Sequence, residues 1–183
     1  YLLKKMNNIE LSISYTTRPI RINEIESRDY FFTNKEKFTD LKKKNFFIES
    51  AKIFNDHYYG SPYKNISRAF KNNKNILFDI DWQGARKLRK NFDKKQILDF
   101  FILPPNKKEL KKRLEKRGRD NKKEISIRLS HALKEISHHN EYKYVLINDN
   151  IIKTVNYLID IINHNILLDN INREVEKNLK FIK

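Results

Sequence analysis

The sequence predicts an α/β protein built on a parallel sheet. Three apolar runs suit buried strands, and amphipathic stretches that suit helices alternate with them, which is the pattern of strands joined by helices. The runs are residues 75–80, 97–103 and 144–149. The stretch from residue 14 to about 62 differs, because its short strands have mixed polarity. It predicts an inserted antiparallel unit.

The first part of the chain predicts short strands around one helix. Residues 10–15 (ELSISY) alternate apolar and polar side chains, as a half-buried strand does. A capping-box pattern at Thr33 and Glu36 predicts the start of a helix, with Phe38 and Leu41 on its apolar face. The other elements expected here are a short strand at 29–32, a strand at 45–54 and a turn at 56–62.

The second part predicts helices between the buried strands. A helix after the turn should place Tyr63, Ile66 and Phe70 on one face. Pro104 and Pro105 end the strand at 97–103. The remaining helices are expected at 82–90, from Asn106 with Leu110 and Leu114 inside, across Ile125–Ile136 after a charged break at 117–124, and from about 150 to the end.

The chain is strongly basic, with 39 Lys and Arg against 23 Asp and Glu in 183 residues and a net charge of +16. Such a charge is typical of proteins with polyanionic partners, such as nucleic acid, an anionic membrane or phosphorylated small molecules. Compositional drift is the simpler explanation, because lysines are spread along a chain rich in Lys, Asn and Ile. A nucleic-acid binder needs a clustered patch, so this scatter argues against that class.

The chain contains no cysteine, which excludes disulfides, thiol catalysis and Cys-ligated zinc. No apolar run approaches a membrane span, and no signal peptide is visible. His131, His138 and His139 do not form the zinc-binding motif H-E-x-x-H. We therefore expect a soluble cytoplasmic protein.

Two arginines follow the first strand of the insert. The segment SYTTRPIR (14–21) contains Arg18 and Arg21. The planar fork of arginine binds a phosphate or carboxylate bidentately, which lysine cannot do. Two close arginines in a chain that mostly uses lysine indicate an anion site, and two solvated arginines are the alternative.

Two acids follow the apolar run at 75–80. Asp79 and Asp81 lie two residues apart at its end, where α/β folds bind ligands, and alternation places both on one face. An acid there can hold Mg²⁺ through water or hydrogen-bond a ligand. Asp81 suits the N-cap of the next helix nearly as well.

Three arginines mark the segment after Pro105. Arg113 and Arg117 lie four residues apart, hence on one face of a helix, and Arg128 lies in the next helix. Such arginines could close over transferring phosphates. A solvated amphipathic helix is the alternative.

Taken together and in order, these stretches resemble guanylate kinase. The matching pieces, from about Ile9 into the last helix, are S-x-T-T-R-x-x-R, D-Y-F-F, F-I-E, Y-Y-G-S, L-F-D-I-D-W-Q-G-A, F-I-L-P-P, R-L-x-x-R-G and I-N-D. The resemblance implies a P-loop-kinase-like parallel sheet core flanked by helices, with an inserted mixed or antiparallel GMP-binding subdomain and a helical lid. The implied divisions are a core of 1–13, 63–106 and 138–183, a GMP-binding subdomain of 14–62 and a lid of 107–137.

The resemblance also implies an activity: transfer of the γ-phosphoryl group of ATP to GMP, giving ADP and GDP, with Mg²⁺. Arg18, Arg21, Tyr30 and Tyr59 would bind the GMP phosphate. Glu49 would accept hydrogen bonds from guanine N1–H and N2–H, whereas adenine has an acceptor at N1. The other base-reading residues implied are Ser14, Ser61 and Asp81.

On the ATP side, the resemblance implies roles for five residues. Arg113, Arg117 and Arg128 would neutralise the transferring phosphoryl group, with Arg113 and Arg117 also binding ATP. Asp79 resembles the acid near Mg²⁺, which it would hold through water, and Asn148 the residue near adenine. The implied partners are the small molecules GMP and ATP, without nucleic acid or membrane, and a homo-oligomer is left open.

The family's glycine-rich P-loop, G-x-x-x-x-G-K-[ST], does not occur in these 183 residues. We expect a chain truncated at its N-terminus, with the loop upstream of Tyr1, and poor turnover of ATP by the 183 residues alone. A catalytically inactive module that binds a phosphorylated partner in the GMP pocket is the alternative. The lid arginines, Asp79 and Asn148 favour the enzyme.

Overall fold

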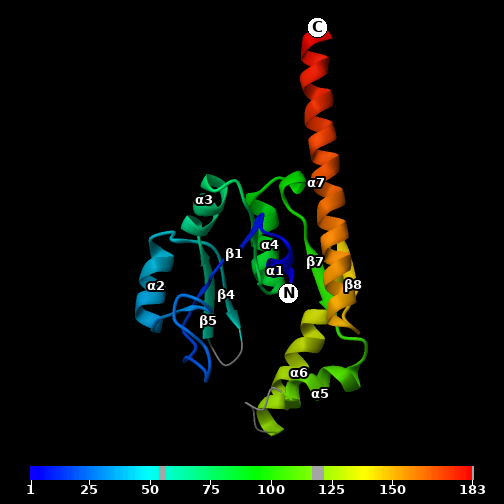
Figure 1. Cartoon of the computed structure of the whole chain (residues 1–183). Coiled ribbons are helices and arrows are strands. Elements are labelled where there is room, and N and C mark those ends of the chain that lie inside the picture. Colours follow the sequence, from blue (N-terminus) through cyan, green and yellow to red (C-terminus); the bar gives the residue numbers. More distant parts are fainter. Residues whose placement is uncertain (54–56, 117–121, 183) are drawn as a thin grey trace.

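The computed structural model describes residues 1–53, 57–116 and 122–182. In chain order the elements are α1 (Leu2–Lys5), β1 (Ile9–Leu11), β2 (Tyr15–Thr16), β3 (Phe31–Phe32), α2 (Lys35–Lys43), β4 (Phe47–Ile53), β5 (His57–Pro62), α3 (Tyr63–Lys71), β6 (Asn75–Leu77), α4 (Trp82–Asn91), η1 (Lys94–Gln96), β7 (Phe100–Leu103), α5 (Lys107–Lys116), α6 (Lys122–Ile136), η2 (His139–Glu141), β8 (Tyr144–Ile147) and α7 (Ile151–Ile182). Figure 1 shows α5 and α6 together at one end of the body, and α7 running far past the other end.

The core contains parallel strands linked by helices, which confirms the predicted α/β class. β1 pairs in parallel with β6, and β7 pairs in parallel with β8. In the described residues these are two separate pairs rather than one continuous sheet, and the strands are shorter than the apolar runs. The carboxyl ends of β6 and β8 lead into Asp79 and Asn148, so two of the predicted ligand residues follow parallel strands.

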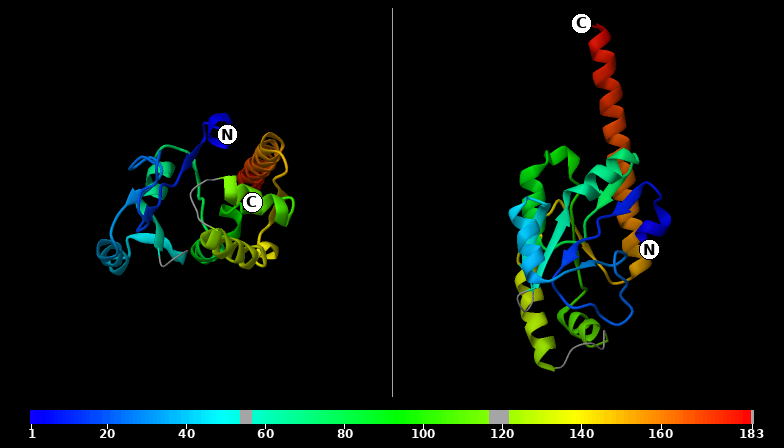
Figure 2. Two further views of the ribbon diagram at one scale, coloured as in Figure 1. Left: turned by 90° about the horizontal axis from the view of Figure 1, so that it is seen from below. Right: turned by 90° about the vertical axis from the view of Figure 1, so that its left-hand side faces the viewer.

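The insert is a mixed four-stranded sheet with the order β3-β2-β5-β4, whereas the polarity of the stretch predicted an antiparallel unit. β2 runs parallel to β3 and antiparallel to β5, and β5 is antiparallel to β4. One buried cluster joins this sheet to the rest of the molecule: Ile48 of β4 packs with Ile66 of α3 and Leu88 of α4. The insert is therefore held against the core by apolar contacts. Figure 2 shows its strands seen from two further sides.

The strand predicted at 10–15 is in fact two strands in different sheets. Residues 9–11 form β1 in the core, and residues 15–16 form β2 in the insert. Between them, the buried side chain of Asn65 donates from Nδ2 to the carbonyl of Ile13 (2.9 Å) and to Ser12 Oγ (3.1 Å). Alternating polarity correctly predicts an extended chain. The side-chain amide of Asn65 binds this chain at the point where it leaves the core sheet and enters the sheet of the insert.

The turn predicted at 56–62 is wrong for the described part, because His57–Pro62 is strand β5. Gly60 favoured a turn in the sequence, yet in the structure its missing side chain leaves room for two aromatic rings. A Cβ atom at Gly60 would lie 3.0 Å from ring atoms of Phe38 and Phe47. Pairing with β4 and β2 on both sides overrides the turn-forming residues.

Two helix predictions need correction. Thr33 is still extended, with its N–H donating to the carbonyl of Thr16, so α2 starts later and Asn34 Oδ1 caps it by accepting from Lys37 N at 2.8 Å. α3 forms as predicted, but Tyr63 and Phe70 are exposed. Its buried residues are Asn65, Ile66 and Ala69.

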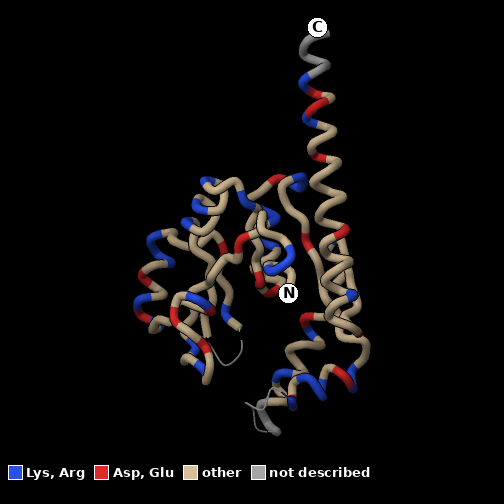
Figure 3. The backbone as a smooth tube through the Cα atoms, viewed as in Figure 1, with Lys and Arg blue, Asp and Glu red and all other residues tan. Residues whose placement is uncertain are grey.

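Basic residues are distributed over many elements. Figure 3 shows Lys and Arg along α2, α3, α4 and α5 instead of on a single face. Within the described residues, no helix has both the length and the apolar character needed to cross a bilayer.

Phe38 should be the most sensitive position of the insert. Its side chain is 1% exposed and stacks on Phe47 (4.6 Å between ring centroids) and Tyr58 (5.5 Å). Phe38→Ala is expected to lower the free energy of unfolding by about 3–5 kcal/mol, measured by urea denaturation. Phe70→Ala, at a side chain that is 59% exposed, is the matched control. Equal losses in the two variants would contradict this packing.

Candidate active site

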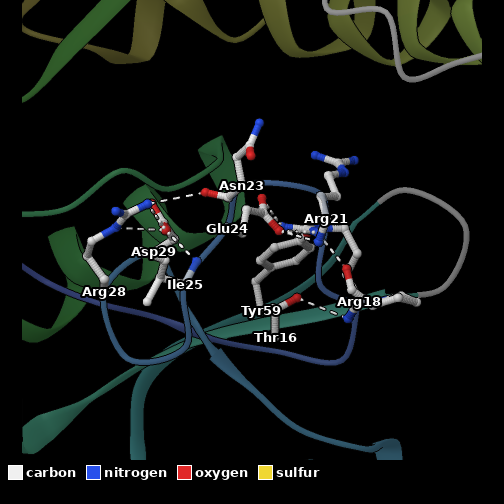
Figure 4. Close-up of polar contacts among 10 residues, drawn as sticks. Thr16, Arg18, Arg21, Asn23, Glu24, Ile25, Arg28, Asp29 and Tyr59 are labelled. Atoms are coloured by element: carbon white, nitrogen blue, oxygen red, sulfur yellow. Dashed lines mark hydrogen bonds and ion pairs between the residues drawn. The ribbon is translucent and has the colours of Figure 1, made fainter.

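Arg18 is a buried cation surrounded by aromatic rings. It follows β2, is 6% exposed, and its Nε donates to Tyr59 Oη at 3.2 Å. Its guanidinium lies over the ring of Tyr30 at 5.3 Å, and over that of Phe32 at 5.6 Å. The structure therefore brings together three of the residues expected to bind a phosphate, Arg18, Tyr30 and Tyr59, as Figure 4 shows in part.

Arg21 adds a second positive charge at the edge of this cluster. Figure 4 shows its guanidinium pointing away from the contacts that surround Arg18. Partial burial, followed by the charges of Arg18 and Arg128, lowers the pKa of Arg21. Arg128 belongs to α6, so arginines from two separate segments lie near enough for their positive charges to interact at this place. Such a place favours an anion.

Glu24 is a site residue that sequence reasoning missed. Its carboxylate accepts from both terminal nitrogens of Arg18 at 2.9 Å, and from the backbone N–H of Arg21 at 2.8 Å. Burial alone would raise the pKa of Glu24, but these bonds outweigh it and lower the pKa. The available signal was an acid three residues after Arg21 in a basic stretch.

A buried carboxylate lies on the neighbouring strand pair. Glu49 of β4 is 4% exposed and faces Ser61 of β5, whose Oγ donates to Glu49 Oε1 at 2.7 Å. Since that proton is used, Ser14 is the donor in the 3.1 Å contact between the two serine hydroxyls. Burial is the largest cause that raises the pKa of Glu49, and the negative charge of the nearby Asp81 raises it further. The hydrogen bond from Ser61 acts in the opposite direction without cancelling the rise. The predicted base-reading residues therefore form one connected group.

The absence of a side chain at Gly84 leaves room for the carboxylate of Glu49. A Cβ atom at Gly84 would lie 2.8 Å from Glu49 Oε2, closer than real Cβ contacts. Asp81 caps the same helix, because its Oδ1 accepts from Gly84 N at 2.9 Å and its Oδ2 accepts from Gln83 Nε2 at 3.1 Å. The N-cap alternative for Asp81 is thus confirmed, and it places the acid beside Glu49. Gly84 was not selected from the sequence.

Asp79 lies just beyond β6 and is exposed. Its charge raises the pKa of Tyr30, second to burial. This carboxylate is therefore near enough for its negative charge to act on Tyr30. Within the described residues, no group of three or more His, Asp or Glu side chains could hold a metal ion. Magnesium often uses only one or two carboxylates together with substrate phosphates, so a single exposed Asp79 fits that ion.

Helices α5 and α6, which are expected to form the lid, contribute arginines and one acid. Arg113 of α5 donates from Nη2 to the carbonyl of Asn148 at 2.9 Å, so two residues expected on the ATP side are in contact. Arg117 lies outside the described residues. Glu135 of α6, another residue the sequence reasoning missed, has its pKa raised by burial and then by Asp81 and Asp79. Glu135 of α6 therefore lies near enough to the acids that follow β6 for their charges to act on it.

Ring stacking and ion pairs attach the end of α6 to α4. The rings of Trp82 and His138 stack at 3.9 Å between centroids. Arg86 lies over the Trp82 ring at 4.5 Å and is paired with Glu141. Hydrogen bonds from Arg86, and less strongly from His138, lower the pKa of Glu141 to about 2. These contacts hold the segment that follows α6, the helix that contains Arg128, against α4.

Comparison with known proteins identifies the family. A sequence profile described as guanylate kinase matches residues 1–165. The chain belongs to the guanylate kinase family. Guanylate kinase of Rickettsia prowazekii is 45% identical over 161 residues, covering 88% of this chain and 80% of the relative. Guanylate kinase of Wolbachia pipientis wMel is 44% identical over 162 residues, again covering 88% and 80%.

A solved guanylate kinase has the same fold. The crystal structure of the enzyme from Anaplasma phagocytophilum matches with a TM-score of 0.74 and 34% identity, and the match covers 89% of this chain and 79% of that one. The guanylate kinase family and its P-loop-kinase-like fold, both expected from the ordered motifs, are confirmed.

Glu49→Gln is expected to raise the melting temperature of the ligand-free guanylate kinase chain at neutral pH. Burial raises the pKa of Glu49, so the ionised form costs free energy in the folded state above that pKa. As the pH falls through the folded pKa toward the unfolded value, the folded protein takes up a proton and the cost disappears. The gain from Gln should therefore shrink toward acid pH.

Thermal melts of the two proteins from about pH 8 down to about pH 4.5 measure this difference. Gln keeps an oxygen that can accept from Ser61, so the serine contact is retained in the variant. A gain that did not change with pH would show that ionisation of Glu49 is not its cause.

Proposed function

We propose that the chain acts as a guanylate kinase, transferring the γ-phosphoryl group of ATP to GMP to give ADP and GDP. One observation carries this proposal: a buried carboxylate, Glu49, and a buried arginine, Arg18, both contact strand β5. Tyr59, which contacts Arg18, and Ser61, which contacts Glu49, lie two residues apart on β5. They face the same side, about 7 Å apart along the strand, and so can hold the two ends of one nucleotide.

Guanine selectivity would arise at Glu49. Its carboxylate can accept from guanine N1–H and N2–H, with Ser14, Ser61 and Asp81 around it. Adenine has an acceptor at N1 and would leave the buried carboxylate unpaired. A site of this hydrogen-bonding kind can discriminate by roughly 10⁴-fold.

The reaction itself needs little covalent chemistry from the protein. Arg18, Arg21, Tyr30 and Tyr59 would hold the GMP phosphate so that one of its oxygens attacks in line. Arg113, Arg117 and Arg128 would stabilise charge on the transferring phosphoryl group. Magnesium, when held through water by Asp79, would neutralise charge on the ATP phosphates. Asn148 would contact adenine.

Residues 14–62 would then bind GMP, residues 107–137 would close as a lid, and the remaining residues would form the core. The converging charges of Arg21 and Arg128 support a lid that acts on the GMP phosphate. An inactive module that binds a phosphorylated partner would need the fork of Arg18 and Arg21 but neither Arg113 nor Asn148. The contact between Arg113 and Asn148 supports the enzyme.

GMP should protect this chain against thermal unfolding and AMP should not. Binding to the folded state alone raises the melting temperature with ligand concentration, so a roughly 10⁴-fold preference gives a clear difference at matched concentrations. Glu49→Ala should abolish the difference, whereas Glu36→Ala, at an exposed acid of α2, should preserve it. Equal protection by GMP and AMP of the unmodified chain would refute the base-reading role of Glu49.

A further inference from the structure

The guanidinium of Arg18 has almost no free hydrogen-bonding capacity. It carries five N–H donors. Nε donates to Tyr59 Oη at 3.2 Å, and Nη1 donates to the carbonyl of Pro19 at 2.6 Å and to Glu24 Oε2 at 2.9 Å. Nη2 donates once to Glu24 Oε1, also at 2.9 Å. Within the part of the chain that the structure describes, these contacts leave one N–H of Arg18 without an acceptor, on Nη2.

Glu24 is itself fixed to the loop that it stabilises. The oxygen that accepts from Arg18 Nη1 also accepts from the backbone N–H of Arg21 at 2.8 Å. The side chains of Arg18 and Glu24 are only 7% and 14% exposed. A buried cation is costly unless it is paired, and this pair has ideal bidentate geometry. Glu24 therefore sets the rotamer of Arg18 before any ligand binds.

The hydrogen bond from Arg18 also orients the hydroxyl group of Tyr59. Because Tyr59 Oη accepts from Arg18 Nε, its own proton is directed elsewhere. The donors that remain around this cluster then include the Nη2 proton of Arg18, the Tyr59 proton and the guanidinium of Arg21 (Figure 4).

We propose that Glu24 is a positioning residue for the acceptor phosphate: it fixes Arg18 so that one Arg18 proton and the Tyr59 hydroxyl are presented to the phosphate of GMP. This inference rests on the proposed GMP site. Glu24 does not touch the nucleotide but acts through Arg18. Without it, the guanidinium would be a buried charge with several unpaired donors, free to adopt other orientations.

The same loop provides a matched control. Asp29 also accepts from an arginine, Arg28, at 2.7 Å and from a backbone N–H, that of Ile25, at 2.8 Å. The Arg28 and Asp29 side chains are 59% and 35% exposed, and Figure 4 shows the pair beside the Glu24 cluster. Asp29→Asn therefore removes a similar carboxylate without touching Arg18.

The test is calorimetric titration of the chain and its variants with GMP and with guanosine, which lacks the phosphate. Glu24→Gln is expected to weaken GMP binding by about tenfold or more and to leave guanosine binding unchanged, because charge-assisted hydrogen bonds are lost only at the phosphate end. Asp29→Asn should change neither. Glu24→Asp keeps the charge on a shorter side chain, and it should weaken the binding of GMP but not that of guanosine. This variant replaces Glu24→Gln in the test if the Gln variant does not fold.

The outcomes separate this inference from the function on which it rests. Glu24 variants that bind GMP as tightly as the unmodified chain, or more tightly, would overturn the inference and make Glu24 irrelevant or a competitor of the phosphate. Equal loss of GMP and guanosine would also overturn it, since that indicates a general structural role. An unmodified chain that binds neither ligand would refute the GMP site itself.

Discussion

The antiparallel pairing of β4 with β5 is the constraint on which the candidate site depends. Its register sets Glu49 opposite Ser61 and, two residues along β5, leaves Tyr59 facing Arg18. A slip of one residue would turn each of these side chains to the opposite face. The pairing is in turn fixed by aromatic packing around Gly60, where the rings of Phe38 and Phe47 leave no room for a side chain. Core packing and ligand geometry thus share one strand pair.

In the part of the chain that the structure describes, the buried charge is paired at one end of the candidate site and unpaired at the other. Arg18 is paired with Glu24 and almost fully hydrogen-bonded, so it is held ready without a ligand. Glu49 is buried without an opposing cation in hydrogen-bonding contact among the described residues, and its pKa is raised. In the GMP site that we propose, the phosphate end is thus preorganised, whereas the base end carries a cost that the donors of guanine would relieve. Such a cost is typical of sites that sacrifice stability for specificity.

The fold class and several residues of the candidate site could be predicted from the sequence. Arg18, Glu49 and Ser61 belong to short motifs whose order identified the family, and the alternation of apolar runs with helices predicted the fold class. Glu24 and Gly84 were missed, because their importance lies in contacts with Arg18 and Glu49, and the sequence does not show which atoms those contacts bring together. Arg117 was predicted but lies outside the described residues.

The sequence by itself determined which residue types are available and the local conformations that they favour, since helical and strand periodicity are properties of neighbouring residues. It also determined the family, through the order of its motifs. Only the tertiary structure decided that the segment from Ile9 to Thr16 divides between two sheets, that His57–Pro62 is a strand, and that Glu24 holds Arg18. The two strand arrangements depend on partners supplied by distant residues, and the Glu24 contact depends on a loop conformation that brings it back to Arg18, six residues away. No local pattern specifies either.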